Sequence, residues 1–134
     1  MSVYNAVVDS VVGLINTLDL FAQMTRGALT TTNSLVCEIA PSNTQEVYLD
    51  KNSLISLTLA INGKHANLQT LTDDLGKILD NLSRRKEYPT GNGFEIVDIT
   101  IGNFPRTIGR EENSDWIAAC DLIVKFYRKD DETD

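Results

Sequence analysis

Long apolar runs are missing from this sequence. None of them approaches the roughly 20 consecutive apolar residues that a membrane-spanning helix needs. The first residues carry no basic segment of the kind that opens a signal peptide, and Asp9 and Asp19 interrupt the apolar stretch that follows. We therefore expect no contact with a membrane, no signal peptide, and synthesis in the cytoplasm.

Histidine and cysteine are scarce, with only His65, Cys37 and Cys120 present. Zinc needs about four ligands, more than these residues supply. Both cysteines lie in strand-like apolar runs, which favours buried reduced thiols over a disulfide. A catalytic His65 would need a nucleophile or carboxylate beside it, but Asp73 and Asp74 lie about two helical turns further along. We therefore expect no catalytic centre, no metal and no cofactor.

Basic residues are outnumbered, with 12 lysines and arginines against 19 acidic residues and a net charge of -7. This balance argues against binding nucleic acid through the whole surface. The chain of 134 residues has the length of one domain. We expect a single α+β domain at residues 1–128, followed by a solvated acidic tail at 129–134.

Periodic apolar residues indicate the secondary structure. Spacings of three and four predict amphipathic helices at residues 2–20 and 66–85. Alternation with a period of two predicts strands, and these lie at residues 35–39, 46–49, 55–61, 94–104 and 116–127. Strand runs with few crossover helices predict an α+β fold, in which one mainly antiparallel sheet carries two amphipathic helices. The expected core is formed by Leu57, Leu59, Leu75, Ile78 and Leu82.

The last two predicted strands carry finer expectations. In the strand at 94–104, alternation places Val97, Ile99 and Ile101 on one face. The strand at 116–127 is partly apolar on both faces. We expect the first helix or a neighbouring molecule to cover its second face.

The connection between these two strands, residues 105–114, is the main candidate for a binding surface. Connections between antiparallel strands usually have ~2–5 residues, so this one is long. Long loops on a rigid sheet often bind partners, although a solvated hairpin tip would have the same composition. Charges of both signs surround one isolated isoleucine here. The candidate oligomer or partner contacts are Arg106, Ile108, Arg110, Glu111 and Glu112.

In the order and lengths of its elements, the chain resembles the small tail-terminator proteins of long-tailed bacteriophages, also known as minor capsid proteins. The resemblance starts with the N-terminal amphipathic helix and covers most of the chain from Ser34 to Arg128. The segments that carry it are EVYLD at 46–50, ISLTLAI at 55–61, the leucine-rich helix, GFEI at 93–96, DW at 115–116 and KFY at 125–127.

This resemblance implies an α/β domain, with helices on one side of a sheet, in a virion structural protein at the tail-head junction, made in the host cytoplasm. Six copies would form a ring that caps the tail tube, stops its polymerisation and joins it to the head-tail connector protein. DNA would pass the acidic lumen without specific binding, and the family offers no catalytic residues to carry over. The alternatives are another phage neck or tail-completion subunit, a small cytosolic hydrolase that uses His65, or a regulatory binding module.

Overall fold

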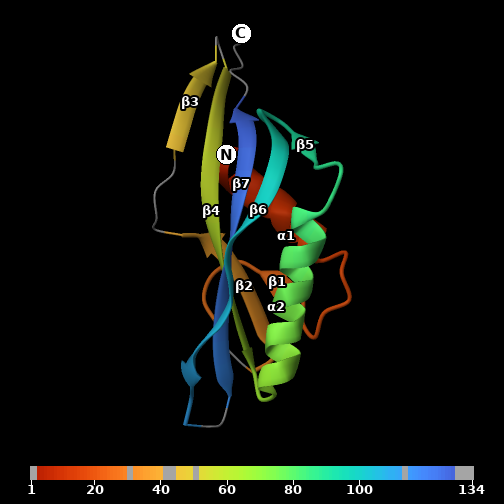
Figure 1. The fold of residues 1–134 in the computed structure, drawn as a ribbon, viewed down its shortest axis with the longest axis vertical. Coiled ribbons are helices and arrows are strands. Elements are labelled where there is room, and N and C mark those ends of the chain that lie inside the picture. Colours follow the sequence, from red (N-terminus) through yellow and green to blue (C-terminus); the bar gives the residue numbers. More distant parts are fainter. Residues whose placement is uncertain (1–2, 30–31, 41–44, 50–51, 113–114, 129–134) are drawn as a thin grey trace.

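The computed structural model describes residues 3–29, 32–40, 45–49, 52–112 and 115–128. In these ranges the chain forms two helices and seven strands (Figure 1). The helices are α1 (Val3–Ile15) and α2 (Leu68–Ser83). The strands are β1 (Met24–Thr25), β2 (Ser34–Ile39), β3 (Gln45–Leu49), β4 (Asn52–His65), β5 (Thr90–Gly91), β6 (Phe94–Arg110) and β7 (Trp116–Arg128). The predicted tail at 129–134 lies outside the described residues.

The strands form one sheet in the order β1-β2-β4-β7-β6-β5, and β3 pairs with β4 next to β2. Its centre consists of the long strands β4, β7 and β6, which are antiparallel to one another. Among the described pairs only β1 and β2 are parallel. The predicted α+β fold with a mainly antiparallel sheet is therefore confirmed.

Both helices pack on the same face of the sheet. The α1 residues Val7, Val8, Val11 and Ile15 belong to one buried cluster with the inward side chains of α2, β4 and β7. The Tyr4 ring meets the Phe126 ring edge-on, with the centroids 6.2 Å apart. The predicted core of Leu57, Leu59, Leu75, Ile78 and Leu82 is confirmed, since each is at most 1% exposed.

This arrangement excludes the first helix, one of the two covers expected for the second face of β7. Its inward face, which includes Cys120, Leu122 and Val124, is fully buried under the helices. The opposite face, which carries Ile117 and Ile123, is not covered by α1, and both side chains are partly exposed. Within the described residues, no helix lies on that face of the sheet.

The structure also corrects the bounds of two elements. The helix α1 ends at Ile15, not at residue 20, because the Asn16 side chain turns the chain back through two hydrogen bonds. Its Nδ2 donates to the Met24 carbonyl at 3.0 Å, and its Oδ1 accepts from the Met24 N–H at 2.7 Å. The strand β4 continues past residue 61 through Gly63, where a Cβ atom would lie only 2.5 Å from Leu71 Cδ1. This glycine therefore admits the helix instead of ending the strand.

Candidate functional site

The predicted loop at 105–114 is wrong, because residues 105–110 continue β6 and only residues 111–115 connect it to β7. The pairing of β6 with β7 is irregular at four places, including the steps from Asn103 to Arg106 and from Thr107 to Gly109. A bulge adds an unpaired residue to a strand and interrupts the alternation of its side chains. Pro105 falls within one of these irregular steps, where a strand tolerates its missing N–H. The segment therefore reads as a loop in the sequence although it pairs as a strand.

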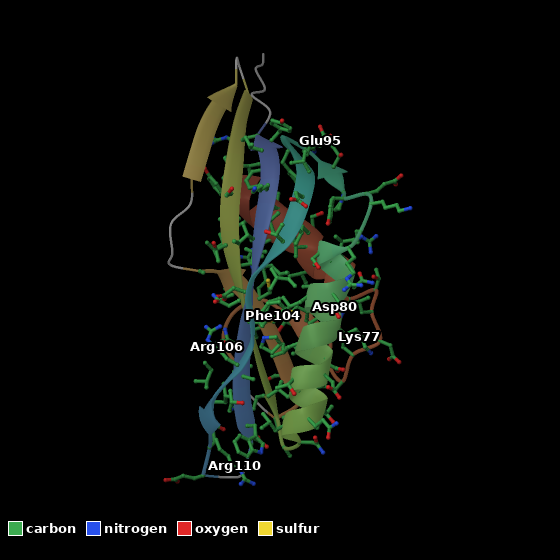
Figure 2. All side chains as sticks on the ribbon, viewed as in Figure 1. Lys77, Asp80, Glu95, Phe104, Arg106 and Arg110 are labelled. Carbon is green, nitrogen blue, oxygen red and sulfur yellow. The ribbon has the colours of Figure 1, made fainter. Side chains whose placement is uncertain are left out.

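Three of the predicted contact residues have partners in different parts of the molecule, and Figure 2 labels two of them, Arg106 and Arg110. The Arg106 guanidinium lies 3.8 Å from the Asp121 carboxylate, on the open face of the sheet. The Arg110 guanidinium stacks over the Trp116 ring at 4.8 Å from its centroid. The Glu111 carboxylate pairs with Lys64 at 3.0 Å, which ties the connection to the end of β4.

The remaining two predicted contacts, Ile108 and Glu112, are exposed, and Ile108 shows 58% of its surface. The structure adds Phe104, which is 70% exposed and which the sequence placed at the end of a predicted strand. Large apolar side chains exposed together mark an interaction surface more often than single scattered ones do. We call the exposed segment with Phe104, Arg106, Ile108 and Arg110 the β6 ridge. Arg106 pairs with Ala119 and Arg110 with Trp116, so the two arginines lie on opposite faces of the sheet.

The β6 ridge lies on an open edge of the sheet. On the side away from β7, the strand β5 pairs only with Phe94 and Glu95, and no other described strand follows it there. An open edge offers backbone donors and acceptors to a partner, while bulges and a proline limit uncontrolled pairing. The β6 ridge contains both bulges and Pro105, so a partner would contact it mainly through its side chains.

The open face of the sheet has a shallow depression of about 420 Å³ beside the ridge. Thr58, Ala60 and Gly102 keep its lining small. Asn103 Nδ2 donates a hydrogen bond of 2.6 Å to the Asp121 carboxylate, which is only 14% exposed. This contact holds the bulged part of β6 against β7.

The outward face of α2 forms a second surface, which is open and is lined by this helix and the residues that end it. Gly76 lies in its middle, Asp73 and Asp80 flank it, and Lys77, Arg84 and Arg85 line it as well. Neither carboxylate makes an ion pair or hydrogen bond with a described residue. Lys77 differs, because its Nζ donates to the Asp19 carbonyl at 2.8 Å.

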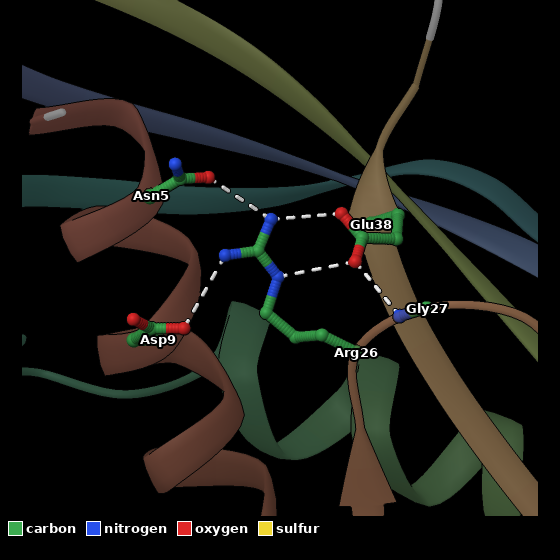
Figure 3. Close-up of polar contacts among 5 residues, drawn as sticks. All are labelled: Asn5, Asp9, Arg26, Gly27 and Glu38. Carbon is green, nitrogen blue, oxygen red and sulfur yellow. Dashed lines mark hydrogen bonds and ion pairs between the residues drawn. The ribbon is translucent and has the colours of Figure 1, made fainter.

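The opposite edge of the sheet is closed by a polar cluster around Arg26 (Figure 3). Its guanidinium donates to both carboxylate oxygens of Glu38, at 3.2 and 2.8 Å, and pairs with Asp9 on α1 at 3.3 Å. Asn5 Oδ1 and the Gly27 N–H complete the cluster. The hydrogen bond between the two side chains raises the pKa of Arg26 and lowers the pKa of Glu38. These contacts fix α1 to β2, a structural role.

The residues considered for chemistry are engaged in packing. His65 Nδ1 accepts a hydrogen bond of 2.8 Å from the Asn67 N–H, and its ring lies edge-on to Phe21 at 4.7 Å. In the part of the chain that the structure describes, no three His, Cys, Asp or Glu side chains are grouped to hold a metal ion. Over the same residues, no helix has the length and apolar character to span a membrane.

Cys37 and Cys120 are buried and free. Both pair with Ile61, from opposite sides of β4. Two strand spacings, roughly 9–10 Å, therefore separate their backbones, beyond the reach of a disulfide. Burial raises the pKa of each thiol to about 12. The expectation of buried, unpaired thiols is confirmed.

Two exposed surfaces therefore remain as candidates for function, the β6 ridge and the outward face of α2. They lie on different sides of the molecule, with Arg106 and Arg110 away from Lys77 and Asp80 (Figure 2). Comparisons with models of known protein families and with curated proteins find no match for this chain.

Proposed function

We propose that this protein is a structural assembly subunit of a bacteriophage virion, specifically a tail terminator that acts by binding and not by catalysis. Copies of it form a hexameric ring that caps the tail tube, stops its polymerisation and provides the surface for head-tail joining. The observation that carries this proposal is the exposure of Phe104 and Ile108, at 70% and 58%, on the open edge of the sheet.

Exposed apolar area favours association. Complete burial of a phenylalanine or isoleucine side chain contributes about 1.5–3 kcal/mol, and the isolated chain leaves most of this unrealised at Phe104 and Ile108. The described residues also cover only one face of the sheet, so Ile117 and Ile123 are partly exposed on the other. These features support a protein that completes its packing in an assembly.

A ring is supported by the placement of the two candidate surfaces. When one surface of a subunit contacts a different surface of its neighbour, the assembly closes into a ring or grows into a filament. The β6 ridge and the outward face of α2 lie on different sides of the chain, as a head-to-tail contact requires.

The net charge of -7 suits the proposed lumen. An acidic ring repels the phosphate backbone, so DNA passes through it without specific binding. The resemblance of the elements to phage tail terminators supplies the other partners in this proposal, the tail-tube protein and the head-tail connector. The chain would be made in the host cytoplasm and incorporated into the virion.

Sedimentation over a concentration series tests the assembly, alone and with purified tail tubes. We expect a species with six times the monomer mass of 14.8 kDa, formed in solution or on the tubes. Electron microscopy of virions made without the protein should then show tails of uncontrolled length. A chain that stays monomeric in both settings, or normal tails in its absence, would contradict the proposal. A ring that leaves tail length unchanged would favour another neck subunit.

A further inference from the structure

We infer that Asn92 is a site of spontaneous covalent modification, at which the side-chain amide reacts with the Gly93 nitrogen and is lost as ammonia, leaving aspartate or isoaspartate. The site lies in the turn between β5 and β6, before the first half of β6. The reaction needs no partner, so the inference goes beyond the proposed function and does not rest on it.

The chemistry uses only groups of the chain and water. The Gly93 backbone nitrogen attacks the side-chain carbonyl carbon of Asn92, and the new N–C bond replaces the bond from that carbon to Nδ2. The Gly93 N–H proton leaves with Nδ2 as ammonia, and a cyclic succinimide remains. Water then opens this ring at either carbonyl, which gives aspartate or isoaspartate with no change of oxidation state. Glycine favours the attack, because it has no Cβ beside its nitrogen and its backbone rotates most freely.

The sequence contains the Asn-Gly dipeptide twice, and its two copies have opposite surroundings. Asn62–Gly63 lies in β4, which pairs with β2 on one side and with β7 on the other. Gly63 is buried and is aligned with both Leu35 and Ala118, so the ladder holds its backbone. Attack on the Asn62 side chain therefore requires this central strand to open.

Asn92–Gly93 instead forms the two-residue turn of the hairpin between β5 and β6 (Figure 1), and its neighbours Gly91 and Phe94 pair with each other. Asn92 is exposed, and its side chain makes no hydrogen bond with a described residue. The Gly93 N–H donates to no described backbone carbonyl. The φ of Gly93, 84°, lies in the left-handed region that glycine adopts freely. No contact among the described residues therefore keeps the two reacting groups apart.

The isoaspartate product changes the turn itself, because its chain runs through the former side chain and gains one backbone carbon. The strand β5 is joined to β6 by only two described residue pairs. Next to them, the Pro89 carbonyl accepts a hydrogen bond of 3.3 Å from the Ile96 N–H. The turn also lies against α1, where a Cβ on Gly93 would be 3.9 Å from Val3 Cγ2. We expect the longer turn to release β5, which extends the open edge of β6 into its first half.

Peptide mass mapping of the folded wild-type chain, aged at mildly alkaline pH, measures both sites at once. The reaction converts an amide into an acid, and fragmentation of each peptide locates the resulting gain in mass. We expect Asn92 to react at least about a hundredfold faster than Asn62, since a central strand opens only near the global free energy of unfolding. The same chain in denaturant is the matched control. It has both dipeptides without the fold, so the two sites should react there at similar rates.

Hydrogen exchange tests the structural consequence, after the aspartate and isoaspartate forms of the aged chain have been separated. In the isoaspartate form we expect the Ile96 N–H to exchange about tenfold faster or more than in the fresh chain, because a released strand end opens at little cost. Asn92→Asp is the control for the added charge, since it has the carboxylate without the extra backbone carbon, and it should exchange like the wild type. Asn92→Gln keeps an amide but moves its carbonyl carbon away from the Gly93 nitrogen, so it should stay unmodified.

Each outcome supports or overturns the inference. Equal rates at Asn92 and Asn62 in the folded chain, or an Asn92 that reacts only in denaturant, would overturn it. An isoaspartate form in which the Ile96 N–H exchanges as slowly as in the fresh chain would overturn the release of β5. None of these results bears on the ring, which sedimentation of fresh protein tests separately.

Discussion

The two halves of β6 pair with the same strand yet lie in different surroundings. In the first half, Phe94, Ile96 and Ile99 are at most 3% exposed. In the second half, Phe104 and Ile108 are mostly exposed. Figure 1 shows the cause, because the twisted strand follows β7 away from α2 in its second half.

This comparison separates two conditions that a sheet side chain must meet to be buried. Pairing with β7 places the backbone in both halves and so makes each a strand. Burial then depends on whether a helix covers that part of the face, as α2 does for the first half only. The first half therefore contributes to stability, and the second half leaves its apolar groups for a partner.

Substitution of one isoleucine in each half of β6 should give the largest difference in the free energy of unfolding. Ile99→Ala should lower the free energy of unfolding by about 2–5 kcal/mol, because it opens a cavity in the core. Ile108→Ala should change it by less than about 0.5 kcal/mol, as expected at an exposed site. Denaturant unfolding at concentrations where the chain is monomeric measures both. Equal losses would show that the second half is packed as tightly as the first.

Thiol labelling tests whether the second half of β6 stays paired with β7. Cys120 lies opposite the bulge that contains Phe104, but its own side chain faces the buried core. Because burial raises the pKa of Cys37 and Cys120 to about 12, the thiolate is scarce at neutral pH. We expect labelling by a maleimide to be on the order of a thousand-fold slower than for an unfolded cysteine. Fast labelling of Cys120 alone would show that the second half opens.

The regular elements were predictable from the sequence because their periods are regular. The helix stripe of α2 and the alternation in β4 predicted the core, and the runs of strands with few crossover helices predicted a mainly antiparallel sheet. The bulge between Ile96 and Asp98 reversed the alternation in β6. Ile96 therefore joins Ile99 in the core, while Val97 is 39% exposed, against the predicted face.

The candidate surface was only partly predictable. Segment 105–110 was recognised by its charges and by Ile108, but bulges and Pro105 made it look like a loop. Phe104 was missed because exposure of an apolar residue depends on which helix covers it, a property of the tertiary fold.

Removal of the contact that holds the second half of β6 to β7 should lower the free energy of unfolding moderately. Asp121→Ala removes the acceptor for Asn103 and the partner of Arg106, so we expect a loss of about 1–2 kcal/mol in unfolding free energy. Asp121→Asn keeps an acceptor oxygen for Asn103 and should lose only about 0.5 kcal/mol. Thermal unfolding of the two variants gives the ratio. Equal losses would mean that the Arg106 pair, at 3.8 Å, dominates the contact.

The smallest expected effect lies at the opposite edge of the sheet, which the Arg26 cluster closes. The hydrogen bond from Arg26 lowers the pKa of Glu38 in the folded chain. The stabilisation that ionised Glu38 contributes is therefore complete above the unfolded pKa, about 4.3, and is lost as the pH falls through the lower folded pKa. The Glu38 side chain is 39% exposed, so solvent screening limits the contribution to about 1 kcal/mol or less. Glu38→Gln should lower stability by that amount at neutral pH and by progressively less in acid.

Glu87→Gln is the control, since Glu87 makes no ion pair with a described residue, and it should show no such trend. A Glu38→Gln difference that stays constant in acid would show that the closed edge depends on packing and not on this ion pair.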